Sequence, residues 1–133
     1  MTHLLDTNIC SAYLKRPGAL AHRFVQHHGG LAIPTLVLAE LYTWAYRREQ
    51  PEVLLRLIED DFLADVAVLD FDLAAARQFG QCRARTLSTG TVVNPVDLMI
   101  ASVALAHDLT LVTHNVKHFA EIPGLRVEDW LAP

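Results

Sequence analysis

Three acidic side chains occupy positions in this chain where an isolated charge would be costly. Asp6 directly follows the apolar pair Leu4–Leu5. Glu40 lies inside an apolar stretch, and Asp97 lies two residues after Pro95 at the start of another. A lone carboxylate in such surroundings loses hydration, whereas a shared divalent cation would compensate all three. The pattern predicts an oxygen-ligand metal site, with Mg²⁺ as the first choice and Mn²⁺ as the alternative.

Each of these acids also has a simpler structural explanation when it is considered alone. Asp6 can cap a helix, Glu40 can pair with an arginine, and Asp97 can complement a helix dipole. Their coincidence is what indicates a site. Asp6 and Asp97 are expected in first turns that begin on one edge of a sheet, which Glu40 can also reach. A metal there would activate a bound water and stabilise displacement at phosphorus.

Further polar residues are expected around the three acids. Asn115 follows another apolar run and is predicted to act as a fourth catalytic side chain, whose amide oxygen holds a metal-bound water. The alternative for Asn115 is an ordinary turn residue. Hydrogen bonds that orient a metal ligand are as much part of such sites as the ligand itself. We therefore expect Asp6 to be oriented by Thr7, Asn8 and Thr113.

Basic and imidazole side chains could contact a nucleic acid near the same site. Arg47 and Arg48 end one predicted helix, and His114 and His118 lie near the expected metal. All four are candidates for contacts with RNA phosphates, whereas helix-dipole pairing and solvation are the structural alternatives. No serine or cysteine has a histidine and an acid at a spacing typical of a nucleophilic relay, and there is no phosphate-binding glycine loop.

The bulk composition limits the class of protein. With 133 residues, 52% of them hydrophobic, the chain is expected to form one globular domain, residues 1–133. No apolar run is long enough to cross a membrane and the start lacks a basic leader, so a cytoplasmic protein is expected. The net charge of −4 weakly opposes nucleic-acid binding, although a bound metal reverses the local sign. Cys10 and Cys82 are interpreted as small apolar core residues.

Short apolar runs alternate with segments of helical periodicity. Such alternation predicts an α/β fold in which a parallel sheet is covered by helices on both faces. Strands are expected at 3–5, 31–33, 66–69, 109–113 and, as a short fifth, 125–127. Helices are expected at 7–16, 19–28, 34–48, 51–62, 72–87 and 95–107.

Local signals refine the ends of these elements. Thr7, Asp72 and Asn94 are predicted helix caps. The helix over 95–107 is apolar nearly all round, which predicts a central, buried position. Residues 88–91 are expected to form a loop, and the segment after Gly124 is expected to be loosely ordered.

Four segments, in this order and at these spacings, resemble the PIN-domain ribonucleases of the VapC type, which are toxins of bacterial type II toxin–antitoxin pairs. The similarity extends from about Leu4 to Trp130. The segments are LDTN at 5–8, LAEL at 38–41, NPVDLMIA at 94–101 and LVTHN at 111–115, followed by Phe119 and by IPGL at 122–125. The closing segment PGLRVEDW, 123–130, is similar to members of the family that cut initiator tRNA in the anticodon loop.

The resemblance implies a PIN-like three-layer α/β/α fold with four to five parallel strands. It also implies a Mg²⁺-dependent endoribonuclease with Asp6, Glu40 and Asp97 as its acids. A homodimer is implied, neutralised by a small VapB-like antitoxin that inserts its C-terminal segment into the active groove. Many PIN domains carry a fourth acid where this chain has Asn115, and some relatives carry a glutamate at the position of His118. The chain is therefore expected to hold one ion firmly and a second only with substrate.

The predicted function is hydrolysis of structured RNA, with tRNA as a candidate, by metal-activated water that leaves 5′-phosphate and 3′-hydroxyl ends. Two alternatives remain open. One is a nuclease-inactive PIN-like binding module. The other is a phosphoacceptor domain, for which Lys117 is poorly placed.

Overall fold

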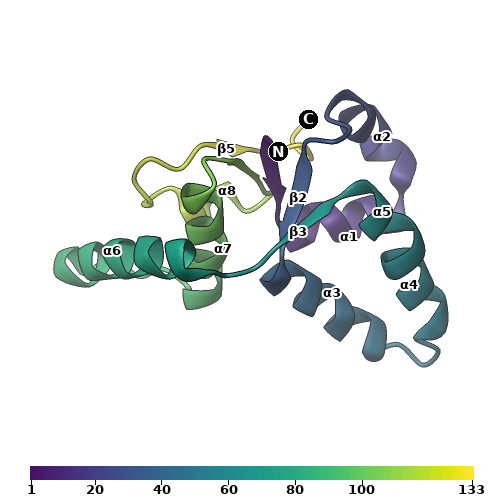
Figure 1. Cartoon of the computed structure of the whole chain (residues 1–133), viewed down its shortest axis with the longest axis horizontal. Coiled ribbons are helices and arrows are strands. Elements are labelled where there is room, and N and C mark those ends of the chain that lie inside the picture. Colours follow the sequence, from purple (N-terminus) through teal and green to yellow (C-terminus); the bar gives the residue numbers. More distant parts are fainter.

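The computed structural model describes residues 1–133 and is organised around one five-stranded sheet (Figure 1). The strand order is β3-β2-β1-β4-β5 and every pairing is parallel. In the register, Leu4 lies opposite both Ala32 and Leu111. The strands are β1 (His3–Leu5), β2 (Leu31–Pro34), β3 (Ala67–Leu69), β4 (Thr110–Val112) and β5 (Val127–Glu128).

Helices connect the strands, as parallel pairing requires. Figure 1 shows α6 and α7 on one side of the sheet and α1, α2 and α4 on the other, which confirms the three-layer α/β/α prediction. The helices are α1 (Thr7–Lys15), α2 (Pro17–Gln26), α3 (Thr35–Tyr46), α4 (Glu52–Arg56), the π-helical turn η1 (Leu57–Phe62), α5 (Leu63–Asp65), α6 (Leu73–Thr89), α7 (Pro95–Ala106) and α8 (Val116–Phe119).

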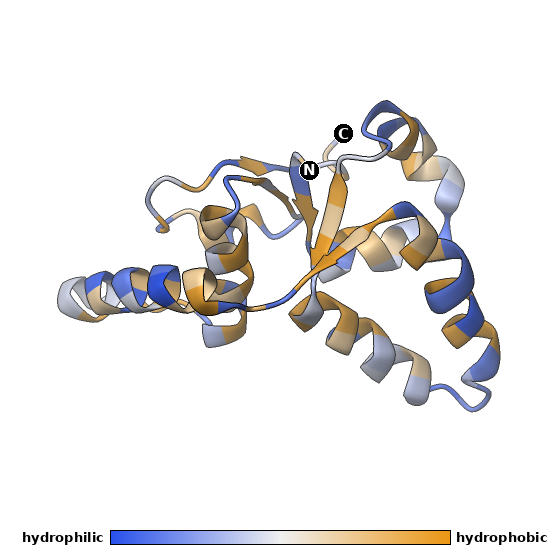
Figure 2. Ribbon diagram, in the orientation of Figure 1, coloured by the Kyte–Doolittle hydropathy of each residue, from blue (hydrophilic) through white to orange (hydrophobic).

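The core explains why the strands could be recognised. Strands covered on both faces are typically apolar at consecutive positions. Strands β1 and β2 are buried throughout, and Figure 2 shows the sheet coloured mostly as hydrophobic. Half of the residues of α7 are buried, as its apolar composition predicted. Cys10 and Cys82 are unpaired and buried, in agreement with their interpretation as core residues. None of the helices combines the length and the apolar character needed to traverse a bilayer.

Two predictions about helix ends were wrong. Thr7 is the first residue of α1 rather than its cap, because Asp6 has the extended backbone of a cap and accepts the Thr7 N–H. Helix α6 continues to Thr89, inside the predicted loop 88–91. It ends there because Gly90 adopts φ +72°, a left-handed conformation that a glycine accepts without strain.

The segment after Gly124 is also more ordered than expected. It contributes β5, and Trp130 is only 6% exposed. The indole stacks on the His27 ring at 5.2 Å between centroids, and its N–H donates to Glu128 at 3.0 Å. Burial of a large aromatic ring with its N–H satisfied fixes this end of the chain.

Candidate active site

The ends of the central strands gather the chemistry at one edge of the sheet. Asp6 follows β1 and Thr113 follows β4, its nearest neighbour on one side. On the other side β1 pairs with β2, which leads into the helix that carries Glu40. The strand order therefore changes direction at β1, because the chain continues to β2 on one side and later adds β4 on the other. Open α/β sheets bind ligands at such a point.

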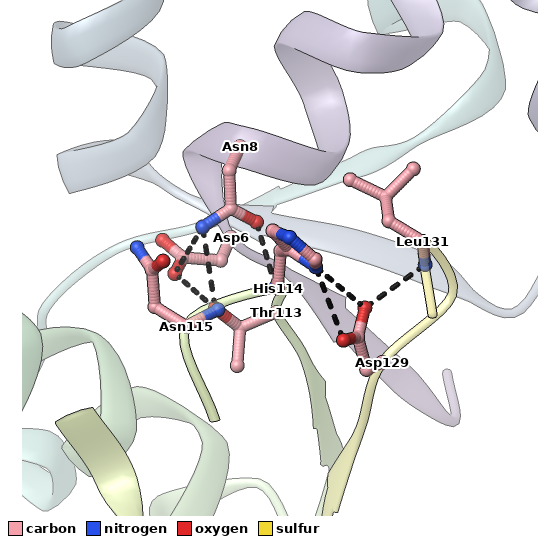
Figure 3. Close-up of polar contacts among 7 residues, drawn as sticks. All are labelled: Asp6, Asn8, Thr113, His114, Asn115, Asp129 and Leu131. Atoms are coloured by element: carbon pink, nitrogen blue, oxygen red, sulfur yellow. Dashed lines mark hydrogen bonds and ion pairs between the residues drawn. The ribbon is translucent and has the colours of Figure 1, made fainter. Parts of the chain in front are cut away.

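Asp6 is the best-held side chain of this edge (Figure 3). It is only 5% exposed. Its Oδ1 accepts the Thr7 backbone N–H at 2.8 Å, and its Oδ2 accepts the Thr113 hydroxyl at 2.7 Å. The Asn8 amide lies at the limit of hydrogen-bond range, 3.5 Å from the same Oδ2. Because the acid is the cap of α1, the start of the helix itself sets its orientation.

Thr113 and Asn8 link the ends of β1 and β4. The fully buried Thr113 hydroxyl accepts the Asn115 backbone N–H at 3.1 Å and the Asn8 amide at 3.4 Å. Asn8 Oδ1 in turn accepts the His114 backbone N–H at 3.0 Å. The structure thus brings together the residues expected to orient Asp6. The Asn115 side chain makes no hydrogen bond within the chain.

Glu40 reaches the site from α3 through Thr7. Its Oε1 accepts the Thr7 hydroxyl at 2.6 Å, so Thr7 contacts both Glu40 and Asp6. We expected the Glu40 carboxylate to lose hydration among its apolar neighbours. That expectation was wrong, because this side chain is exposed. Helical periodicity turns Val37 and Leu41 into the core and leaves Glu40 on the solvent side.

Asp97 comes from the first turn of α7 and faces a histidine. The helix is capped by Asn94, whose Oδ1 accepts the N–H groups of Val96 at 2.8 Å and Asp97 at 3.3 Å. The Asp97 side chain is 22% exposed, and its Oδ2 lies 3.3 Å from Nδ1 of His118. In this chain a histidine therefore occupies one side of this half-buried acid.

The acids influence one another electrostatically. Burial raises the pKa of Asp6 above its ordinary value; hydrogen bonds from Thr113 and Thr7 oppose the rise, and the charge of Asp97 adds to it. Burial likewise raises the pKa of Asp97, His118 opposes the rise, and the charge of Glu40 adds to it. Both shifts mean that the ionised carboxylates lack enough positive charge around them.

The carboxylates fit a hydrated cation better than a closed protein cage. No three His, Cys, Asp or Glu side chains lie close enough together to hold a metal ion by themselves. Mg²⁺ keeps several waters and commonly takes one or two protein carboxylates, so it does not need such a cage. Oxygen donors and raised carboxylate pKa values are what a hard cation would satisfy.

The basic and imidazole residues predicted to contact RNA lie on both sides of Asp6. Arg47 and Arg48 line a cavity of about 610 Å³ that also includes Thr7, Glu40 and the half-buried Trp44. A second cavity, of about 530 Å³, shares Trp44 and Arg48 and continues along α1 and α4. On the opposite side, His118 contacts Asp97, and Nδ1 of His114 lies 3.1 Å from Oδ2 of Asp129.

Comparisons with known proteins decide the family. The PIN domain family model matches residues 3–125. The tRNA(fMet)-specific endonuclease VapC of Shigella flexneri is 41% identical over 96% of both chains. The chain belongs to the VapC ribonucleases of the PIN-domain family. Ribonuclease VapC2 of Haemophilus influenzae strain Rd is 34% identical over 98% of this chain and 99% of the relative.

Solved structures agree with this VapC assignment. A chain of a DNA-bound VapBC structure from Salmonella typhimurium superposes with a TM-score of 0.91, at 38% identity and with 98% of each chain covered. The resemblance drawn from four short segments is therefore confirmed, as are the fold and the enzyme class. Nucleases of the PIN family generally depend on divalent metal ions.

One residue of this VapC-type site escaped the sequence reasoning. Asp129 was not among the candidate site residues, yet its side chain is only 18% exposed and it contacts His114. The signal that could have found it is topological. Asp129 directly follows the short fifth strand, so in a parallel sheet it must lie at the same edge as Asp6.

Proposed function

We propose that this VapC-type PIN domain is a Mg²⁺-dependent endoribonuclease that acts in the cytoplasm as the toxin of a toxin–antitoxin pair. The observation that carries the proposal is the state of Asp6. It is a buried carboxylate at the C-terminal end of the central strand β1. Its pKa is raised, and the charge of Asp97 adds to the rise. A carboxylate kept there at neutral pH calls for a cation. The names of the VapC relatives support the ribonuclease chemistry.

We assign the acids separate roles. Asp6 and Asp97 hold the ion, and Glu40 either holds it or orients the attacking water, with Thr7 fixing its Oε1. When bound, Mg²⁺ supplies the charge that activates water and stabilises the leaving 3′ oxygen. Thr113 and Asn8 keep Asp6 in place, and the free Asn115 amide can hold a water beside it. Because His118 stands where a further acid would be, we propose that one ion is held firmly.

We further propose structured RNA, with initiator tRNA as the first candidate, as the substrate. A relative named as tRNA(fMet)-specific, at 41% identity, supports this choice. The cavity beside Glu40 offers two guanidinium groups, Arg47 and Arg48, for phosphates and the face of Trp44 for a base. Arg47 and Arg48 place positive charge beside the site, so RNA can bind there although the protein has a net negative charge.

The two cavities, which share Trp44 and Arg48 in their linings, are our proposed docking groove for a VapB-like antitoxin. They extend from Glu40 to an apolar part lined by Leu14, Val53, Leu54 and Leu57. A C-terminal antitoxin segment with apolar and cationic residues would fit both ends. The VapBC neighbours support the partner. We also propose a homodimer, which sedimentation of the isolated toxin can test.

The testing experiment is a cleavage assay on a panel of tRNAs with Mg²⁺, Mn²⁺ or EDTA. We expect metal-dependent cuts with 5′-phosphate and 3′-hydroxyl ends in the wild type and none with folded Asp97→Asn protein. Asp61→Asn, a change of an exposed acid on η1, is the matched control and should cleave normally. Cleavage in EDTA, or 2′,3′-cyclic phosphate ends, would refute the proposal. A folded wild type that binds RNA but never cuts it would favour the inactive binding module.

A further inference from the structure

The C-terminal segment brings a second acid–imidazole pair to the site edge (Figure 3). Asp129 follows β5, and its two carboxylate oxygens lie 3.2 and 3.1 Å from Nδ1 of His114. Asp129 Oδ1 also accepts the Leu131 backbone N–H at 2.9 Å. Burial acts to raise the pKa of Asp129, but the Leu131 N–H and His114 together hold it below its ordinary value. Asp129 is therefore a carboxylate anion that is itself fixed.

His114 is held from two directions and leaves one nitrogen unused. Its backbone N–H donates to Asn8 Oδ1, which ties it to the residue beside Asp6. Asp129 holds the ring at Nδ1, because an ionised carboxylate can only accept a hydrogen bond. Nε2 makes no hydrogen bond or ion pair within the chain, and the side chain is 56% exposed. Such an exposed pair contributes little to stability, so its fixed geometry points to a ligand.

The strand order gives the position of this nitrogen relative to the acids. Along the sheet edge, α3 with Arg47 and Arg48 follows β2, Asp6 follows β1, and His114 follows β4. Adjacent strands lie roughly 5 Å apart. His114 thus stands on the side of Asp6 opposite the two arginines, and a nucleic-acid strand crossing Asp6 would meet hydrogen-bond donors on both sides.

We propose that His114 contacts an RNA phosphate flanking the scissile one, on the β4–β5 side, and that Asp129 positions it. Because the Asp129 carboxylate and a phosphate are both hydrogen-bond acceptors, the proposed contact has Nδ1 donate to Asp129 and Nε2 donate to the phosphate. The proposal deepens the ribonuclease function and rests on it. His114 is then a substrate-contacting residue, and Asp129 is a positioning residue that never touches RNA.

The test measures RNA binding and cleavage with His114→Gln and Asp129→Asn proteins. The probe is a synthetic anticodon arm of initiator tRNA, bound in Ca²⁺ and cleaved in Mg²⁺. We expect each variant to raise Kd and KM about tenfold with kcat nearly unchanged, and His114→Gln to reduce the salt dependence of log Kd by about one phosphate contact. His22→Gln, which alters an exposed histidine of α2, is the matched control and should match the wild type.

Chemically modified probes identify the contact. Replacing single phosphates by neutral methylphosphonates should weaken wild-type binding at one flanking position and should have no further effect there in His114→Gln. If a 2′-deoxy substitution shows this coupling instead, His114 contacts ribose and the phosphate proposal is wrong. A His114→Lys variant should bind RNA well with or without Asp129, because a lysine ammonium does not need a second side chain to orient it.

The outcomes separate this inference from the proposed function. Wild-type cleavage together with unchanged Kd and KM in His114→Gln overturns the inference and leaves the ribonuclease intact. A fall in kcat alone also overturns it, because the residue would then act in the reaction step. If the wild type binds but does not cleave, and binding still depends on His114, the phosphate contact stands and the nuclease proposal fails. Melting temperatures within about 2 °C of the wild type would show that the variants are folded.

Discussion

Replacing Thr113 by valine is the most direct test of how the fold holds Asp6. The two side chains have nearly the same shape, so the change removes a hydroxyl without opening a cavity. Thr113 is fully buried and donates to Asp6 Oδ2 at 2.7 Å. A hydrogen bond to a charged group contributes about 1.5–3 kcal/mol. We expect the free energy of unfolding at pH 7 to fall by that amount.

The same change should weaken metal binding. The Thr113 bond lowers the pKa of Asp6, so its loss raises that pKa further above the ordinary value. A proton then competes better for the carboxylate, and Asp6 also loses its orientation. Loss of such a supporting bond typically costs 10–100-fold in metal affinity. The Mg²⁺ concentration for half-maximal cleavage should rise by that factor, and the acid limb of activity should move to higher pH. The stability difference should shrink in acid, where Asp6 is protonated in both proteins.

Urea unfolding and Mg²⁺ titration of cleavage are the measurements. Thr110→Val, at the start of the strand that Thr113 follows, is the matched control, because its hydroxyl only accepts a 3.3 Å bond from the exposed Arg126. It should stay within about 0.5 kcal/mol of the wild type with an unchanged Mg²⁺ midpoint. Thr113→Ser should restore both properties in part. Equal losses in the two valine variants would mean that the strand, not the hydroxyl, is being measured, and the account of Asp6 would be wrong.

Three other predictions follow from the burial of charged groups. Mg²⁺ at tenfold its Kd should raise the wild-type melting temperature by about 5 °C, the equivalent of about 1.4 kcal/mol, and should leave that of Asp97→Asn unchanged. An equal rise in both proteins would show that Asp97 does not hold the ion. Cys10 is fully buried, and burial raises its pKa well above 9.0. The native protein at pH 7 should therefore resist alkylation of Cys10 by iodoacetamide until it is unfolded. Rapid labelling of the native protein, measured by mass spectrometry, would contradict this. Burial, followed by neighbouring positive charge, lowers the pKa of His27 from 6.5, so the unfolded chain binds this proton more tightly and stability should decline as the pH falls below about 6.5. Melting curves from pH 7.5 to 5.5 should show a smaller decline for His27→Gln than for the wild type, and identical slopes would count against it.

Elements whose signals are local were predictable. Leu4–Leu5 of β1 and Leu31–Ile33 of β2 are uninterrupted apolar runs, as expected for strands covered on both faces. Asp72 and Asn94 cap α6 and α7 because a short polar side chain satisfies free N–H groups one turn ahead, which depends on nearby residues alone. The acids Asp6 and Asp97 stood out for the same reason, since each interrupts or opens an apolar run.

Predictions failed where distant parts of the chain decide the outcome. Trp130 is buried because the fifth strand pairs with β4 and places the indole against His27, and neither contact leaves a pattern in the closing segment. Glu40 has apolar neighbours in sequence, but its exposure depends on which face of α3 packs inward. Asp129 lies at the site only because β5 is parallel to β4 and ends at the same edge.

The amino-acid sequence by itself therefore determined which segments become strands and helices, which acids are chemically unusual, and which family the chain resembles. These properties follow from periodicity, capping and short motifs, all of which act over a few residues. Tertiary structure alone decided that His118 faces Asp97 and that Asp129 contacts His114. Side chains on different strands meet only through strand order and register, which arise from long-range pairing and packing of the whole core.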